Sequence, residues 1–204
     1  MNGQRKTTAA WVGGMLACIL LLVAGIAYVV IGINGRSEVQ NNLKREQIVG
    51  TPDMKPGGIK TDLQIALPTC DVAGVTVDTG QKAKCFASYM RIHALEATGG
   101  KTFSQMDRFL LPNNAGTTSD QTKAAKDPKT GAPVENAARN IWVTQTALSS
   151  ALNMAFFAEQ VSLFAIVVGI LMIIIGIGLG VITLSTWGLA PWKKTGAPVA
   201  VPAT

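Results

Sequence analysis

The sequence predicts a mainly α membrane protein with two transmembrane helices and a small helical segment between them. Residues 9–33 and 161–187 form apolar runs of 25 and 27 residues without an ionisable side chain. At 1.5 Å of rise per residue, such a run crosses the roughly 30 Å of a bilayer's hydrocarbon core. Composition agrees, because 48% of the residues are hydrophobic and all twelve acidic residues lie between the two runs.

The two runs divide the chain into five segments. The first span is preceded by a short polar tail, and the second is followed by a Pro-rich tail that we expect to be disordered. The segment between the spans is long enough for a modest core of its own. The boundaries are 1–8, 9–33, 34–160, 161–187 and 188–204.

The basic residues that flank the second span set the orientation. Lys193 and Lys194 follow it directly, whereas the nearest base before it is Arg139, more than twenty residues away. Cytoplasmic flanks are enriched in Lys and Arg, so the C-terminus is predicted to be cytoplasmic. Two spans then place both termini in the cytoplasm and residues 34–160 outside the plasma membrane.

A cleaved signal is the alternative for the first span, since Met15-Leu16-Ala17-Cys18 loosely resembles a lipoprotein cleavage site. The run stays apolar as far as Ile33, where a mature lipoprotein would be polar. We therefore expect the span to be retained.

Helical periodicity continues outside the spans. The first helix is expected to extend over 37–49 as a stalk that breaks near Gly50, and the second span to continue a helix that starts near Glu135. Whether that long helix is unbroken is left open by the sequence. Between them we expect a loop over 52–69 with a short strand at 63–67, helices over 81–98 and 102–111, and a polar surface loop over 112–133.

Small residues recur at four-residue spacing in both spans. The candidates for close helix packing are Ala9, Gly13 and Ala17 in the first span, and Gly176 and Gly180 in the second. Such stripes let membrane helices approach closely, either within the chain or between subunits. The alternative is that Gly and Ala are simply common in membrane helices.

Cys70 and Cys85 both lie in the segment assigned to the outside, fifteen residues apart. In an oxidising compartment this pair favours a disulfide over a metal site. Cys18 lies within the first span and is expected to be inert.

His93 is the only histidine, and this count excludes several kinds of site. A di-iron carboxylate bundle needs two Glu-x-x-His pairs, whereas here one pair occurs in reversed order, His93 and Glu96. A His-rich zinc site lacks ligands as well, and there is no Gly-x-Ser-x-Gly elbow. We therefore predict no catalytic, cofactor-binding or metal-binding residues, and expect His93 to be a packed or hydrogen-bonded helix residue.

Glu159 lies at the outer end of the second span. Its carboxylate is expected to reach the headgroups or to pair with a base such as Arg36, and a role in ion or proton transfer is the alternative.

Four stretches resemble a family of actinobacterial two-span membrane proteins, over roughly residues 10 to 185. They are Asp78–Lys84, His93–Thr102, Ala125–Gly131 and Asn140–Glu159. Members are often described as aromatic ring-opening dioxygenases, after the alpha subunit of protocatechuate 4,5-dioxygenase. The resemblance implies a two-span topology and an actinobacterial source. Extradiol ring opening needs iron held by two histidines and a carboxylate, a set that a chain with one histidine cannot supply alone.

These observations favour a non-enzymatic membrane protein. The net charge of +6 does not indicate nucleic-acid binding, because the middle segment holds fourteen bases against twelve acids without a dense basic block. We expect an accessory or scaffolding subunit of a larger cell-envelope complex. A respiratory complex is one candidate for that assembly. Its partners would be membrane lipids and other subunits or further copies of itself. The alternatives are an external module that binds a lipid or cell-wall ligand and, with less support, an enzyme.

Overall fold

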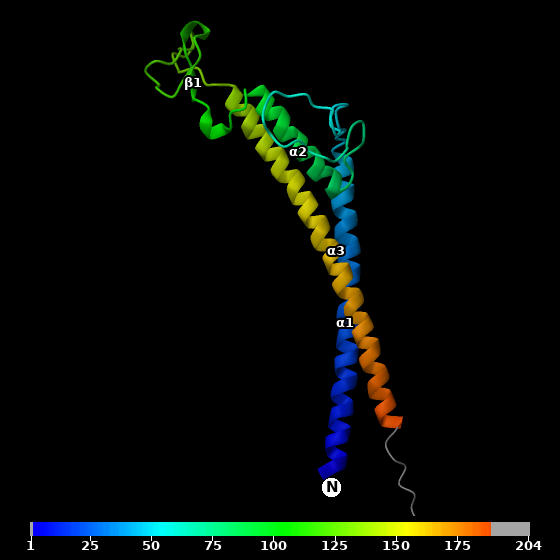
Figure 1. Cartoon of the computed structure of the whole chain (residues 1–204). Coiled ribbons are helices and arrows are strands. Elements are labelled where there is room, and N and C mark those ends of the chain that lie inside the picture. Colours follow the sequence, from blue (N-terminus) through cyan, green and yellow to red (C-terminus); the bar gives the residue numbers. More distant parts are fainter. Residues whose placement is uncertain (1, 189–204) are drawn as a thin grey trace, which may run out of the picture. The chain divides into compact units, whose positions relative to one another are not determined.

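The computed structural model describes the backbone of residues 2–188 and the side chains of 9–186. Three α-helices dominate it: α1 (Asn2–Arg45), α2 (Gly80–Ala97) and α3 (Ala138–Gly188). Figure 1 shows them in order along the chain. The mainly helical class is confirmed, and α3 is unbroken over 51 residues. The predicted tail over 189–204, with Lys193 and Lys194, lies outside the described residues.

Short elements connect α2 to α3. Two 3₁₀ turns, η1 (Phe103–Gln105) and η2 (Pro112–Asn114), alternate with two short strands, β1 (Phe109–Leu110) and β2 (Thr117–Thr118). The strands pair antiparallel, with Phe109 opposite Thr118. The rest of the polar segment 112–133 is loop, as its composition predicts.

The chain forms two compact units. One consists of residues 1–31 with 165–204 and is called the span unit; the other, Gly32–Phe164, is called the inter-span unit. Helices α1 and α3 each contain an apolar stretch long enough to cross a membrane. In the span unit large apolar side chains such as Leu20 and Ile174 are more than half exposed. A lipid environment accommodates such surfaces, and the two apolar helices therefore favour association with a membrane.

Glycines bring the two helices of the span unit into close contact. A Cβ added at Gly25 would lie 2.8 Å from the carbonyl oxygen of Gly169, and one added at Gly169 would lie 2.6 Å from that of Gly25. Gly176 and Gly180 are also buried; Gly176 lies against Leu22, and Gly180 faces the Cys18 thiol.

The predicted stripe of Ala9, Gly13 and Ala17 is not the face of α1 that contacts α3. Gly13 lies outside the contact between the two helices. A Cβ added at Gly13 would have open space around it, whereas one added at the neighbouring Gly14 would meet Thr183. Ala9 is exposed and Ala17 is half-buried. The contact uses Gly14, Cys18 and Gly25 because they share one helical face with Leu21 and Leu22.

Replacing Gly25 with Ala should therefore separate the two helices and destabilise their pairing by about 1–3 kcal/mol, the usual cost of overpacking. Gly13→Ala is the matched control, since it makes the same chemical change at an open position. Unfolding in detergent micelles measures the difference; equal stabilities for the two variants would contradict the contact.

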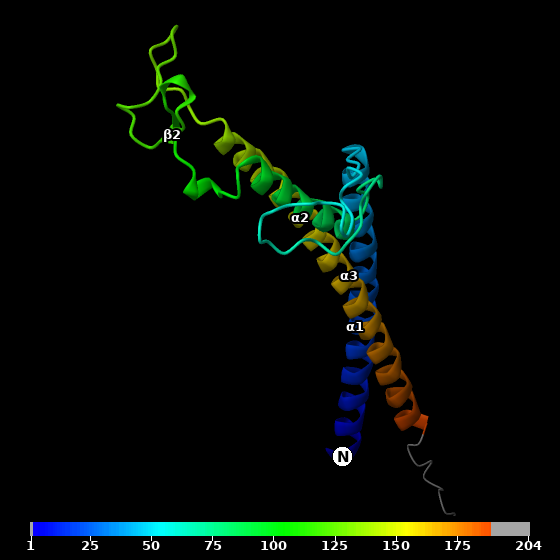
Figure 2. The same ribbon diagram turned by 45° about the horizontal axis from the view of Figure 1, so that its top comes forward.

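The core of the inter-span unit is built from all three helices and the loop between α1 and α2. It contains Leu43 of α1, Val72 and Val77 of the loop, Tyr89 of α2 and Leu152 of α3. Figure 1 and Figure 2 both show α2 running beside the first half of α3. Burial of these side chains supplies the main drive for packing the three helices.

Helix α2 has the ends that its sequence predicts. Thr79 is its N-cap, and the hydroxyl oxygen accepts a hydrogen bond from the Lys82 amide. At the other end, Gly99 and Gly100 adopt positive φ, the backbone conformation that terminates helices. The predicted helix over 81–98 is therefore confirmed to within one residue.

Two other expected elements are wrong. Residues 102–111 form η1 and β1 in place of a helix, because the Arg139 guanidinium donates to the carbonyls of Phe103 and Met106 and the Leu110 amide donates to Val134. The strand expected over 63–67 is absent from the described chain, where the Ile65 amide closes a tight turn onto Leu63.

The long helix begins three residues later than expected. Asn136 is buried, and its side-chain oxygen accepts from the Ala138 amide, which caps the start of α3. Its amide group donates to the carbonyl of Asp107 and so ties this start to the segment before β1.

Candidate functional site

Glu159 is the buried acidic residue at which the three helices meet. Its Oε1 accepts from Arg36 Nε at 3.0 Å and from Gln40 Nε2 at 2.9 Å, and its Oε2 accepts from the Gly80 amide at 2.5 Å. The side chain is 8% exposed, compared with 48% for Arg36. One carboxylate on α3 therefore holds two side chains of α1 and the first amide of α2.

The local sequence explains how α2 comes so close. A Cβ at Gly80 would lie 2.7 Å from the Cα of Phe156 and 2.7 Å from Glu159 Oε2. A glycine is thus required for the backbone of α2 to approach α3 here. The amide sits in the first turn of α2, where unpaired N–H groups and the helix dipole favour a carboxylate.

The expected pairing of Glu159 with Arg36 is present. Two of its partners, Gln40 and Gly80, were not predicted. Gln40 lies four residues after Arg36, on the same face of α1. This spacing is the sequence signal by which Gln40 is recognised as a second partner once Arg36 is paired with Glu159. All three donors reach the carboxylate, so it acts as a structural acceptor between helices in this arrangement.

His93 is hydrogen-bonded, as expected. Its Nε2 lies 2.7 Å from Asp53 Oδ2, and both side chains are about one third to two fifths exposed. The Thr51 hydroxyl also donates to Asp53 and, with a smaller effect from His93, lowers the pKa of Asp53 below its usual range. The pair ties the loop after α1 to α2.

The lowered pKa of Asp53 gives a pH-dependent prediction. A carboxylate with a depressed pKa stabilises the fold above its unfolded value of about 3.9 and loses that contribution as the pH falls through the folded value. The native chain should therefore unfold at a higher denaturant concentration than Asp53→Asn. This difference between the two midpoints should be largest above about pH 4 and should become smaller as the pH falls below it. A difference that is constant between neutral and acid pH would contradict the assignment.

Glu96, the other acidic candidate, is exposed on α2, and it is not brought together with Glu159. Cys70 and Cys85 form the expected disulfide, with their Cα atoms 6.1 Å apart. The Tyr89 hydroxyl donates to the carbonyl of Cys70 at 2.8 Å, and burial raises the pKa of Tyr89, which keeps it a donor. Disulfide and phenol together fasten the loop to α2.

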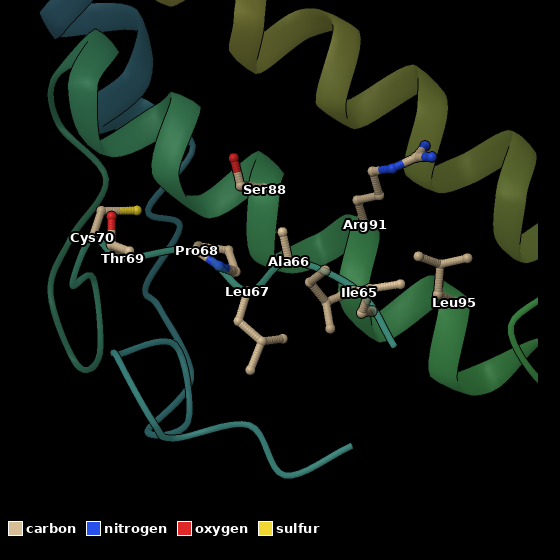
Figure 3. Close-up of a pocket in the computed structure, with 10 residues that line it drawn as sticks. Ile65, Ala66, Leu67, Pro68, Thr69, Cys70, Ser88, Arg91 and Leu95 are labelled. Carbon is tan, nitrogen blue, oxygen red and sulfur yellow. The ribbon is translucent and has the colours of Figure 1, made fainter. Parts of the chain in front are cut away.

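An open groove of about 550 Å³ lies between this loop and α2. Figure 3 shows the stretch 65–70 beside α2, with the Arg91 side chain extending toward α3, where its guanidinium lies 5.4 Å from the centre of the Trp142 ring. Ile92 and Leu95 supply apolar lining, and the Ser88 hydroxyl donates to the carbonyl of Lys84 in its own helix. The Arg91 guanidinium is directed toward α3 and away from the loop. Sequence reasoning missed the groove because it depends on the path of an irregular loop.

Among the described residues, no three His, Cys, Asp or Glu side chains gather closely enough to hold a metal ion. Comparisons with protein-family models, with curated proteins and with solved structures find no match to this chain.

Proposed function

We propose that this chain is a non-enzymatic, two-span accessory or scaffolding subunit of a larger membrane complex in the cell envelope. It would lie in the plasma membrane with both termini in the cytoplasm and residues 34–160 outside. The observation that carries the proposal is the Glu159 junction, in which the one buried carboxylate of the inter-span unit is used to fasten three helices together.

Charge and redox chemistry support this orientation. The basic residues Lys193 and Lys194 follow the second apolar run, and the disulfide favours an oxidising compartment for the inter-span unit. The helices of the inter-span unit support the proposed role, because a unit whose helices are fastened together presents its exposed side chains to a partner in a fixed arrangement.

Purification in a mild detergent tests the proposal. The full chain, tagged at one end and expressed in its own host, should elute in an assembly larger than one chain plus micelle. Elution as a lone monomer at every detergent concentration tried would contradict it.

The groove supports a second candidate, a module that binds a lipid or cell-wall ligand outside the membrane. Leu67, Ile92 and Leu95 give the groove an apolar lining beside the Thr69 side chain. Calorimetric titration with soluble cell-wall glycopeptides and with lipid micelles tests it. Leu67→Ser, in the groove, should weaken any binding, whereas Val75→Ser, at another exposed apolar side chain of the same loop, should leave binding intact.

A further inference from the structure

Arg36 is tied to the Glu159 junction through its Nε, which leaves the rest of its guanidinium unused. The Nε donates to Glu159 Oε1 at 3.0 Å, whereas the two terminal Nη groups have no acceptor among the described residues. The side chain is 48% exposed. A planar guanidinium with two free Nη groups offers a fork of donors that matches the oxygens of a phosphate.

The junction holds this guanidinium in place. Glu159 also accepts from Gln40 Nε2 and from the Gly80 amide, so three donors share the charge of the carboxylate. A side chain that is already fixed at one nitrogen loses less conformational freedom when it binds a ligand through the others. Arg36 is therefore preorganised as a donor to an anion.

Arg36 lies at the depth of the lipid headgroups when α1 crosses a membrane. It follows Ile33, the last residue of the first apolar run, by three residues, which is a rise of about 4.5 Å along the helix. The headgroup layer on each side of the hydrocarbon core is about 5–8 Å thick. The next bases on α1, Lys44 and Arg45, lie about 16–18 Å past Ile33 and so beyond this layer.

The charged side chains near the junction do not compete for the same position. Lys82 is paired with Asp78 at 2.7 Å, and Lys84 lies over an aromatic ring. Glu38 follows Arg36 by two residues, a spacing that places the two side chains on different sides of a helix. A phosphate on the free side of Arg36 is thus not repelled by Glu38.

We propose that Arg36 binds the phosphate of one phospholipid of the outer leaflet through its two Nη groups. Lipid phosphates are the anions that surround a helix at this depth, so the position of Arg36 selects the partner as well as its charge. The inference rests on the membrane topology of the proposed function and adds a lipid site to it. One nitrogen of Arg36 then braces α1 against α3, and the other two fix the inter-span unit to the headgroups.

A lipid titration of the full chain in detergent, followed by native mass spectrometry, tests the site. The probes are dioleoylphosphatidic acid and dioleoylglycerol, which differ only in the phosphate. Arg36→Gln keeps a side-chain donor for Glu159 and should bind phosphatidic acid about five times more weakly than the native chain, as expected for the loss of one arginine near a lipid surface. Arg45→Gln is the matched control on the same helix and should bind it as the native chain does.

Arg36→Lys provides a second variant. It keeps a positive charge near Glu159 but loses the fork of donors, so it should bind phosphatidic acid more weakly than the native chain even if Arg36→Gln fails to fold. Retention of the Cys70–Cys85 disulfide reports the folding of each variant. Dioleoylglycerol should bind equally to all of these proteins.

Native-like binding of phosphatidic acid by the folded Arg36 variants would overturn the inference, and so would an equal loss of dioleoylglycerol binding. Inorganic phosphate is the third probe: if it displaces the lipid at an equal concentration, the site takes a free anion and the lipid assignment is wrong. A chain that elutes as a monomer in mild detergent but binds the lipid through Arg36 contradicts the scaffold role and leaves the lipid site standing.

Discussion

Replacing Glu159 with Ala should destabilise the inter-span unit by about 2–3 kcal/mol, because it leaves the Gly80 amide and the Gln40 side chain without their acceptor in a buried place. Arg36 adds little to this value, since its half-exposed guanidinium can return to water. The loss of stability is measured by unfolding the full chain with denaturant in detergent. Limited proteolysis of the loop between α1 and α2 reports the unfolded fraction at each denaturant concentration.

Two further variants isolate the role of the carboxylate. Glu159→Gln keeps one acceptor oxygen and should cost about 1 kcal/mol. Glu96→Ala removes an exposed carboxylate from α2 and should leave stability within about 0.5 kcal/mol of the native chain. If Glu159→Ala unfolds at the same denaturant concentration as Glu96→Ala, the junction does not hold the helices.

Removing the disulfide with Cys70→Ala and Cys85→Ala should cost about 3 kcal/mol, the chain-entropy value for a closed loop of about fifteen residues. The loss should be local. The rate of amide hydrogen exchange should rise over the loop 61–79, while the helical amides of α3 stay protected. In the double variant the Tyr89 hydroxyl still holds the carbonyls of residues 68 and 70 of this loop.

Reduction of the native chain with dithiothreitol is the companion experiment. It should lower stability to that of the double variant and have no effect on the double variant itself. A native chain whose unfolding is unchanged by reductant would show that the bridge does not constrain this loop.

The helices were predictable because their signals are local. Gly99 and Gly100 mark the end of α2, and uncharged runs mark the apolar parts of α1 and α3. The segment 102–111 was predicted wrongly for the opposite reason. Its apolar spacing fits a helix, but Arg139, which lies far along the chain, binds the carbonyls of Phe103 and Met106 and leaves them unable to close helical turns. A distant side chain decided the local structure.

The Glu159 junction was half predictable. A carboxylate beside an apolar run needs a partner, and Arg36 stands at the matching end of the first run, so that pair follows from energetics. The Gly80 amide could not be found in the same way, because its role depends on how closely α2 crosses α3. For the same reason the helix contact in the span unit uses Gly14 and Gly25, whereas a four-residue spacing alone pointed to Gly13.

Thiol labelling in intact cells tests the proposed topology most directly. In the Cys18→Ala background, Gln121→Cys in the exposed loop before α3 should react with a membrane-impermeant maleimide. Thr195→Cys, after the second apolar run, should react only when the cells are permeabilised. Labelling of Thr195→Cys but not of Gln121→Cys in intact cells would contradict a membrane scaffold that holds its inter-span unit outside.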